Sequence, residues 1–269
     1  MSYRDKYLIK SGREVRLEEW DPGETGEVAD KKSAKAILKE NHKRLGELQY
    51  QLYAEGKRSV LIILQAMDAG GKDGTIRHVM GPLNPQGCRV RSFKKPTEEE
   101  LDHDFLWRIH RAAPRKGEIG IFNRSHYEDV LIVRVHNLVE KKVWAGRYDA
   151  INAFERQLAE AGTHILKFYL HISKKEQLKR FQARLDDPSK HWKVNPQDYE
   201  ERKHWDDYRE AYEAALGRCS TEYGPWFVIP ANRKWYRNLV ISNILVETLE
   251  GLDMEYPPPC CDISKIKIE

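Results

Sequence analysis

The feature that most constrains the fold is an apolar run that leads directly into a glycine-rich turn. The run SVLIILQA, residues 59–66, is continuously apolar, as expected of a strand buried on both faces of a parallel sheet. It continues into MDAGGKDGTIRHVM, where a helical pattern begins at about Lys72. A strand, a glycine-rich turn, a lysine and a helix in this order are typical of a phosphate-binding loop, because N–H groups at the helix start face the anion.

The loop departs from the common pattern G-x-x-x-x-G-K-[ST] at two positions. Ala66 replaces the first glycine, and Asp73 stands where a hydroxyl usually binds Mg²⁺. We expect Asp68, a second carboxylate in the loop, to bind a metal or to orient the attacking phosphate. Asp73 has the simpler interpretation of an acid in the first helical turn, which the helix dipole favours.

The remaining loop positions are expected to contact phosphate. Lys72 would reach the transferring phosphoryl group, and the glycines allow close backbone approach and positive φ. The other phosphate-binding candidates of this loop are Ala69, Gly70, Gly71, Asp73 and Gly74.

Five apolar runs alternate with helical patterns along the chain. The expected strands are residues 59–66, 88–93, 117–122, 164–172 and 226–231, and the expected helices are 34–53, from 72 onward, 97–112, 148–161, 174–186, 198–216 and 235–251. This alternation predicts an α/β protein with a mainly parallel sheet covered on both faces. Ligands bind such sheets at the carboxyl ends of the strands, where the glycine-rich turn lies. We expect one domain over 1–269, with 1–30 as an extended arm.

Polar side chains follow the strand at 117–122. Asn123 and Arg124 come first, and the acids Glu128 and Asp129 follow within SHYED. Arg124 is expected to neutralise phosphate charge, and either acid could hold Mg²⁺ or position the acceptor. The alternative is that Ser125 caps a helix whose first turn carries two acids.

A charged segment at about 174–205 is the candidate lid. It holds nine Lys or Arg residues against six Asp or Glu, and prolines break it into two helices. Basic residues on one face suggest a lid that closes over phosphates and excludes water, namely Lys179, Arg180, Arg184, Lys190 and Lys193. The alternative is a solvated charged hairpin. Trp192 and Trp205 are expected to pack rather than to stack on bases.

Charge and cysteine content narrow the class of protein. The net charge is +4, and the apolar runs are too short to cross a membrane. The N-terminus lacks a signal-peptide core. Four cysteines are too few and too irregular for a disulfide framework or a zinc site, so we expect free thiols in a cytoplasmic protein. Cys260 and Cys261 follow three prolines and are expected on a surface tail.

Taken together, AMDAGGKDGTIR, FNRSHYEDVLIVRV and the lid sequence DDPSKHWK…DYEERKHWDDY closely resemble the second family of polyphosphate kinases, over about residues 3–269. The combination of Asn123 with SHYED is similar to its class III group, whose members accept both AMP and ADP. The resemblance implies a three-layer α/β/α P-loop kinase-like fold with a helical lid, and dimers or tetramers.

The resemblance also implies roles for individual residues. Asp68 and Glu128 would bind Mg²⁺, with Mn²⁺ as an alternative, and Lys72 would be the loop lysine. Arg124, Glu128 and Asp129 would form the second catalytic group. Asn123 stands where many members have an acid, so Asp68 and Glu128 must carry more of the metal binding. The phosphate contacts of the lid would be Arg184, Lys190 and Lys193.

The sequence therefore predicts a phosphotransferase that moves the terminal phosphoryl group of inorganic polyphosphate to AMP and ADP, with adenine or guanine nucleotides as partners. One alternative is a nucleoside monophosphate kinase with a nucleoside triphosphate donor. Another is a nucleotide-gated nucleic-acid-binding module, but the basic segments lack the interleaved aromatic residues of such modules. We expect neither a nucleic acid nor a membrane as partner.

Overall fold

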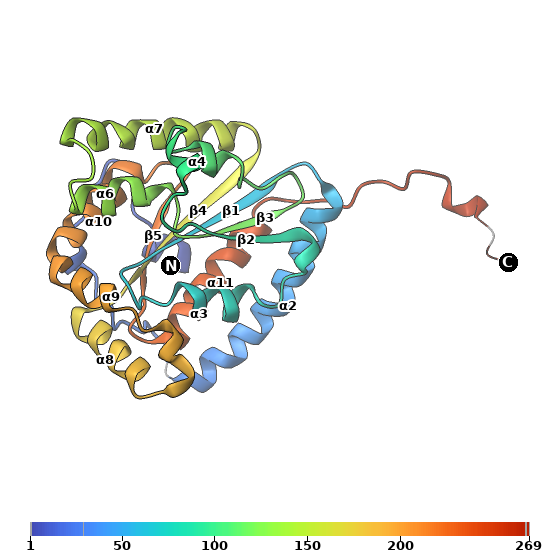
Figure 1. Ribbon diagram of the computed structural model, residues 1–269. Coiled ribbons are helices and arrows are strands. Elements are labelled where there is room, and N and C mark those ends of the chain that lie inside the picture. Colours follow the sequence, from blue (N-terminus) through green and yellow to red (C-terminus); the bar gives the residue numbers. More distant parts are fainter. Residues whose placement is uncertain (1, 29, 267, 269) are drawn as a thin grey trace.

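A computed structural model describes residues 2–28, 30–266 and 268, and its centre is a five-stranded parallel sheet (Figure 1). The strand order is β2-β3-β1-β4-β5, and every neighbouring pair is parallel. The strands are β1 Ser59–Gln65, β2 Cys88–Ser92, β3 Ile119–Asn123, β4 Thr163–His171 and β5 Trp226–Pro230. All five predicted strands are present. β1 is buried along its whole length, as its uninterrupted apolar sequence requires.

Helices cover both faces of the sheet and form the outer layers of a three-layer α/β/α sandwich, as predicted (Figure 1). On one face α2, Lys31–Glu55, packs against α11, Lys234–Glu250. On the other face lie α6, Ile132–Val135, α7, Lys141–Glu160, and α10, Trp205–Cys219. Asp30 caps α2 by accepting from the Ser33 N–H at 2.7 Å, and Gly56 ends it with a φ of +64°.

Several helices are shorter or more divided than predicted. Residues 97–112 form α4, Glu98–Leu101, and α5, Trp107–His110, because Asp104 accepts from the Leu106 N–H at 2.9 Å and starts a new turn. After the glycine-rich turn, α3, Lys72–Thr75, continues as a π-helical turn, Ile76–Met80. The predicted helix at 198–216 begins as α9, Pro196–Glu201, and a 3-10 turn separates it from α10.

The N-terminal segment is not the extended arm that its polar sequence suggests. It contains α1, Tyr3–Tyr7, and a 3-10 turn, Leu17–Glu19. Leu8 bridges Phe227 in the antiparallel sense, and the Ile9 N–H donates to the Trp226 carbonyl at 2.9 Å. The segment therefore covers the open edge of β5, which would otherwise present unpaired backbone groups.

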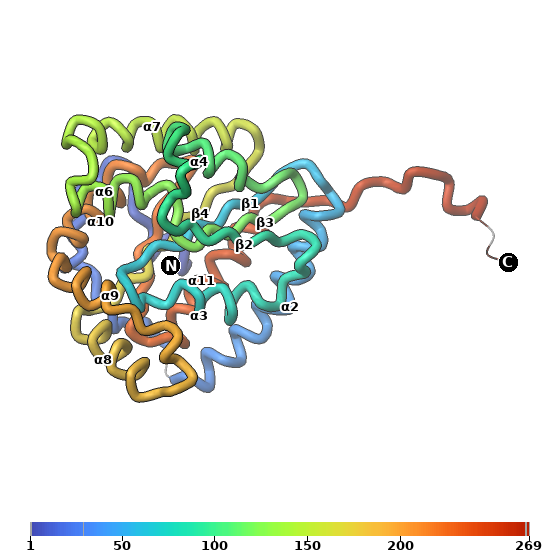
Figure 2. Tube along the Cα trace, in the orientation of Figure 1, coloured from blue at the N-terminus to red at the C-terminus, as the bar shows by residue number. Residues whose placement is uncertain are grey.

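The candidate lid begins with α8, Lys174–Leu185. The C-terminal segment is the chain that follows α11, from residue 251 onward. After α11 the chain still packs on the core at Leu252 and Met254, which are buried. Figure 2 shows the rest of the C-terminal segment running away from the sheet, and Cys260 and Cys261 are exposed on it, as predicted. Among the described residues, no helix is both long enough and apolar enough to cross a membrane.

Candidate phosphate-binding site

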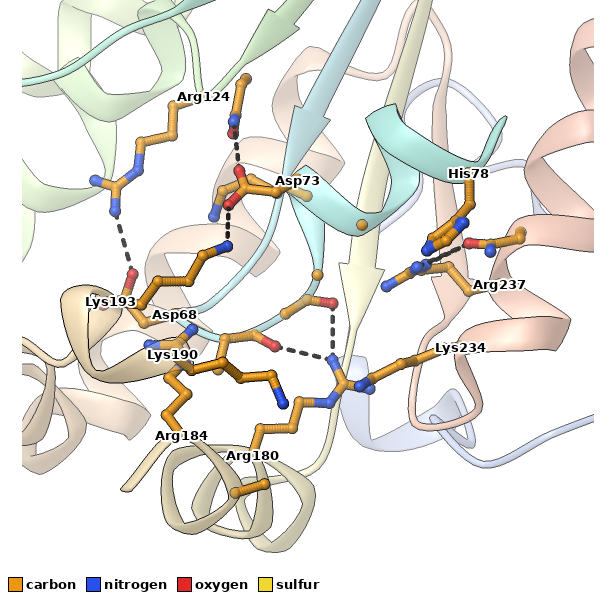
Figure 3. Close-up of a pocket in the computed structure, with 18 of the residues that line it drawn as sticks. Asp68, Asp73, His78, Arg124, Arg180, Arg184, Lys190, Lys193, Lys234 and Arg237 are labelled. Carbon is orange, nitrogen blue, oxygen red and sulfur yellow. Dashed lines mark hydrogen bonds and ion pairs between the residues drawn. The ribbon is translucent and has the colours of Figure 1, made fainter. Parts of the chain in front are cut away.

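A cavity of about 1070 Å³ lies at the carboxyl ends of the strands, as the sequence predicts (Figure 3). The turn after β1, the segments after β2 and β3, the lid, and the first turns of α2 and α11 all contribute side chains. Twelve Lys or Arg residues and three Asp residues line it, whereas the whole chain has a net charge of only +4. A cavity that concentrates positive charge in this way suits a polyanionic ligand.

Side chains of α8 fix the orientation of the glycine-rich turn. Gln177 Nε2 donates to the Asp68 carbonyl at 3.0 Å, and Arg180 Nη1 donates to the Ala69 and Gly70 carbonyls at 2.9 and 3.0 Å. Within a planar peptide the N–H points opposite to the C=O, so the following N–H groups are turned away from α8. Positive φ angles at Ala69 (+59°) and Gly71 (+106°) complete a backbone geometry typical of anion-binding turns.

Lys72 lies at the first position of α3, with its ammonium held inside the turn. Its Nζ donates to the Ala66 carbonyl at 2.9 Å. Burial, and then the nearby Arg124 guanidinium, lower the pKa of Lys72 to about 8. A lysine in this position offers a point charge that can follow a phosphoryl group.

Arg124 connects the end of β3 to the turn after β1. Its Nη2 lies 3.2 Å from Asp68 Oδ1, and its Nη1 lies 3.7 Å from Glu128 Oε2. The carboxylate of Glu128, together with that of Asp68, raises the pKa of Arg124. Arg124 has a φ of +62°, an unusual conformation for a residue with a side chain, and it aims the guanidinium into the cavity.

Asp68 and Glu128 are the candidate metal ligands, and both lie against Arg124. Within the part of the chain that the structure describes, no three His, Cys, Asp or Glu side chains gather closely enough to form a metal site by themselves. Mg²⁺ is commonly held by one or two carboxylates and completed by substrate phosphates and water. Asp68 in the cavity lining, with Glu128 next to it across Arg124, therefore fits a divalent metal of the kind that phosphoryl transfer generally needs.

Asp73 joins three parts of the site. It accepts from Asn123 Nδ2 at 2.9 Å and from Lys193 Nζ at 3.3 Å. Burial alone would raise the pKa of Asp73, but the Asn123 hydrogen bond and Lys193 outweigh it and lower the pKa. Asp73 is thus an acid of the first helical turn, as its simpler interpretation holds, and also the contact between the loop and the lid.

Glu128 and Asp129 lie farther from the cavity than the sequence predicts, since neither lines it. Asp129 Oδ1 and its carbonyl accept from Arg147 Nη1 at 3.1 and 3.0 Å, on the side of α7. Burial raises the pKa of Asp129 to about 6. The prediction that Asp129 acts directly in catalysis is therefore not supported by its position, whereas Glu128 reaches the site through Arg124.

The first half of SHYED is buried and structural. Ser125 accepts from Gln65 Nε2 at 3.1 Å, and Tyr127 OH donates to Glu155 Oε1 at 2.8 Å. The ammonium of Lys167 bonds to both Glu155 and Tyr127. These contacts tie the turn after β3 to β1, α7 and β4, so Arg124 and Glu128 start from a rigid base. The sequence offers no local sign of this network, because Glu155 and Lys167 lie far along the chain.

The lid contributes basic side chains to the cavity, largely as predicted. Arg180, Arg184, Lys190 and Lys193 line it, whereas Lys179 is exposed and does not. Trp192 also lines the cavity and is 79% exposed, so the prediction that it packs is wrong.

Within the lid, Arg184 Nη1 forms an ion pair with Asp198 Oδ2 of α9 at 3.1 Å. Trp205, at the start of α10, packs against the core, as expected.

Further cations line the cavity beyond those predicted from the sequence. They are Lys31, Lys35, Lys94, Lys95, Lys234 and Arg237. Four of them follow β2 or β5 directly or within a few residues, so the strand-end rule that identifies Arg124 also applies to them. The two on α2 carry no such sign, because that helix precedes the first strand.

Comparison with known proteins gives one family. A model of Polyphosphate kinase 2 (PPK2) matches residues 28–257. The chain is 57% identical to the AMP/ADP-polyphosphate phosphotransferase of Meiothermus ruber, covering 98% of this chain and 99% of that protein. It is 46% identical to the ADP-polyphosphate phosphotransferase of Rhodopseudomonas palustris, covering 94% and 91%. The crystal structure of polyphosphate kinase 2 from Arthrobacter aurescens TC1 matches with a TM-score of 0.95 at 46% identity, covering 98% and 94%.

Proposed function

The chain belongs to the polyphosphate kinase 2 family, and from this premise we propose the reaction of its phosphate-binding site. The enzyme transfers the terminal phosphoryl group of inorganic polyphosphate to AMP and to ADP. The observation that carries this function is the cavity itself, in which twelve basic side chains surround a glycine-rich turn. Relatives that cover nearly the whole chain are named for the same activity.

The transfer is an exchange of one phosphoanhydride for another. A phosphate oxygen of the nucleotide attacks the terminal phosphorus of the chain. The new P–O bond forms as the bridging P–O bond breaks, and the shortened polyphosphate leaves with the bridging oxygen. Because no proton has to move for this exchange, the side chains act by positioning and by charge. Because one phosphoanhydride replaces another, the reaction runs in either direction, as the concentrations dictate.

We assign the roles from the contacts of the site. Lys72 follows the transferred group, Arg124 stabilises its equatorial charge, and the turned N–H groups of residues 69–74 hold phosphate oxygens. Arg184, Lys190 and Lys193 bring lid charge to the chain. Asp129 acts indirectly, by holding Arg147.

For the metal we propose Mg²⁺, with Mn²⁺ as the alternative, held by Asp68 and Glu128. When bound, it would neutralise phosphate charge. Arg124 contacts both carboxylates, so it holds Asp68 at the cavity lining and Glu128 on its other side.

We further propose a cytoplasmic location, because the four cysteines are free thiols, as is usual in a reducing compartment. A homodimer or homotetramer is proposed from the family resemblance, and size-exclusion chromatography with light scattering tests it.

One incubation tests the activity. The protein is mixed with polyphosphate, Mg²⁺ and AMP, and ADP and ATP are followed by chromatography. We expect both products. Phosphorylation of AMP from ATP, with no turnover of polyphosphate, would instead identify a nucleoside monophosphate kinase. Salt-dependent oligonucleotide binding without phosphotransfer would identify a nucleic-acid-binding module.

A further inference from the structure

The lid holds the glycine-rich turn through a side chain that lies outside the cavity. Gln177 of α8 is 3% exposed and does not line the cavity. Its Nε2 donates to the Asp68 carbonyl at 3.0 Å, and among the described residues no other donor lies within hydrogen-bond distance of that carbonyl. Because the Asp68 carbonyl and the Ala69 N–H belong to one planar peptide, this bond fixes the direction of that N–H.

Arg202, at the other end of the lid, determines how the Gln177 amide is oriented. Arg202 begins the 3-10 turn between α9 and α10, and its Nη1 donates to Gln177 Oε1 at 2.9 Å. A guanidinium can only donate and a carbonyl can only accept, whereas an amide side chain has an oxygen on one side and an NH2 group on the other. Only one orientation of the Gln177 amide therefore satisfies both neighbours. The reverse orientation would place its oxygen against the Asp68 carbonyl.

Arg202 is itself held in place from two directions. The same Nη1 donates to the Lys174 carbonyl at 2.8 Å, and it thereby joins the start of α8 to the end of α9 at the base of the lid (Figure 1). The preceding residue, Glu201, is hydrogen-bonded to His136 Nε2 at 2.8 Å and accepts from Tyr208 OH at 2.7 Å. His136 ends α6, the helix that follows the turn after β3, and Tyr208 lies on α10. The junction between α9 and α10 is thus attached both to α8 and to the body of the protein.

These contacts form a chain of hydrogen bonds from the lid junction to the phosphate-binding turn. We propose that Arg202 is a positioning residue of the transfer reaction, which acts through the Gln177 amide to hold the Asp68 carbonyl and to turn the N–H groups after it toward phosphate. Arg202 touches no lining residue of the cavity in this chain except through Gln177, and its role rests on the proposed function for the reaction that it serves. When α9 moves away from α8, the amide becomes free to turn, so the phosphate-binding arrangement is complete only while the base of the lid is closed.

Two variants and a neighbouring control test this chain of contacts. Gln177→Met and Arg202→Met each remove one member. Lys203→Met is the control, because Lys203 adjoins Arg202, is 70% exposed and pairs with Glu200 outside the cavity. Each of the two variants should lower kcat/KM for AMP at saturating polyphosphate on the order of 10-fold, since the Asp68 carbonyl either loses its donor or faces an amide that is free to turn. Lys203→Met should match the unmodified protein.

The double variant distinguishes a coupled pair from two separate supports of the fold. If Arg202 acts through Gln177, the combination of Gln177→Met with Arg202→Met should be no slower than Gln177→Met alone. Independent roles would multiply to a loss on the order of 100-fold, and that result would overturn the assignment.

Gln177→Glu separates the contact with the turn from the contact within the lid. A carboxylate keeps the bond to Arg202 but has no donor for the Asp68 carbonyl. We therefore expect Gln177→Glu to lose activity as Gln177→Met does. Activity close to that of the unmodified protein would mean that only the lid contact matters, and the assignment would be wrong.

Hydrogen exchange measures the turn without any turnover of substrate. The Gly70 N–H donates to the Met67 carbonyl and the Thr75 N–H to the Gly71 carbonyl, both at 2.9 Å, so a peptide over residues 67–76 reports the order of the turn. Its exchange should be faster on the order of 10-fold in Arg202→Met, and unchanged in Lys203→Met. Unchanged exchange in Arg202→Met would overturn the assignment. Since Arg202 is only half-buried, this measurement serves even if Gln177→Met does not fold.

Failure of the proposed function would look different. In that case the unmodified protein would not turn over polyphosphate, whereas the faster exchange in Arg202→Met would still support the hold of the lid junction on the turn.

Discussion

The guanidinium of Arg124 lies 3.2 Å from the carboxylate of Asp68, and this contact joins the turn after β1 to the end of β3. The two residues are 56 positions apart, and they meet because β1 and β3 are parallel neighbours whose carboxyl ends share one edge of the sheet. The contact holds a carboxylate suited to a metal and a guanidinium suited to phosphate side by side.

Replacing Arg124 should therefore reduce transfer strongly. Its φ of +62° makes glycine the least strained replacement, so Arg124→Gly removes the side chain without a backbone penalty. We expect kcat to fall on the order of 100-fold or more, the size typical for loss of a group that stabilises developing charge. Steady-state assays with polyphosphate and AMP measure it. A loss of less than about threefold would mean that Arg124 only supports the fold.

The pH dependence of kcat/KM should reveal Lys72. Its pKa is lowered to about 8, so the ammonium is charged below pH 8 and becomes neutral above it. We expect kcat/KM to decline as the pH rises through about 8. The decline in kcat should come at higher pH, because bound phosphate favours the charged lysine.

Lys72→Arg is the control, since a guanidinium keeps its charge throughout this range. It should be slower than the unmodified enzyme but should lack the decline near pH 8. An identical decline in Lys72→Arg would assign it to another group.

Particular elements show how far the sequence determines this structure. β1 is recognisable because a strand buried on both faces must be apolar throughout. The turn after it is recognisable because glycines followed by a lysine and a helix are typical of a phosphate-binding loop. The strand-end rule then places Asn123 and Arg124 correctly. What it cannot give is the side on which each later residue of a short turn lies. Glu128 and Asp129 are adjacent, yet one faces Arg124 and the other Arg147.

Contacts between segments that are distant in the sequence also could not be predicted from local sequence patterns. Arg237 lies behind Gly71 only because α11 packs beside α2, which no spacing within either helix reveals. Likewise, Trp192 resembles a core residue by type, but the lid turn that carries it leaves its ring exposed.

Asp68→Asn should weaken the dependence on metal as well as the rate. The amide keeps the shape and one oxygen but removes the charge that a divalent cation requires. We expect a large fall in kcat and a shift of the Mg²⁺ titration to higher concentration, measured at saturating polyphosphate and AMP. An unchanged titration would remove Asp68 from the metal site. Asp21→Asn, on the surface outside the cavity, is the matched control.

Asp129→Asn should affect stability more than catalysis. The folded pKa of Asp129, about 6, lies above its ordinary value of 3.8, so the folded state holds this proton more tightly than the unfolded chain does. The free energy of unfolding that protonated Asp129 contributes is fully present below about pH 4 and is lost as the pH rises through about 6. Asparagine removes that loss and still accepts from Arg147. At pH 7 we expect the variant to gain up to about 3 kcal/mol relative to its difference at pH 4. Denaturant unfolding at both values measures this, and an equal difference at the two values would contradict it.

The ion pair between Lys193 and Asp73 should control the lid rather than the stability of the fold. Lys193 Nζ lies 3.3 Å from Asp73 Oδ2, and the Asp73 side chain is 69% exposed. Exposed pairs contribute about 0–1 kcal/mol, so Asp73→Asn should leave the midpoint of denaturant unfolding almost unchanged. The amide oxygen still accepts from Asn123, so the loop keeps that contact, while Lys193 loses its counter-charge and becomes free to bind phosphate. We therefore expect KM for polyphosphate to fall or stay constant in Asp73→Asn and to rise in Lys193→Met.

If Asp73 instead bound the metal, Asp73→Asn would lower kcat and shift the Mg²⁺ titration, as Asp68→Asn is expected to do. Measuring KM, kcat and the Mg²⁺ titration for both variants therefore separates a contact that holds the lid from a metal ligand.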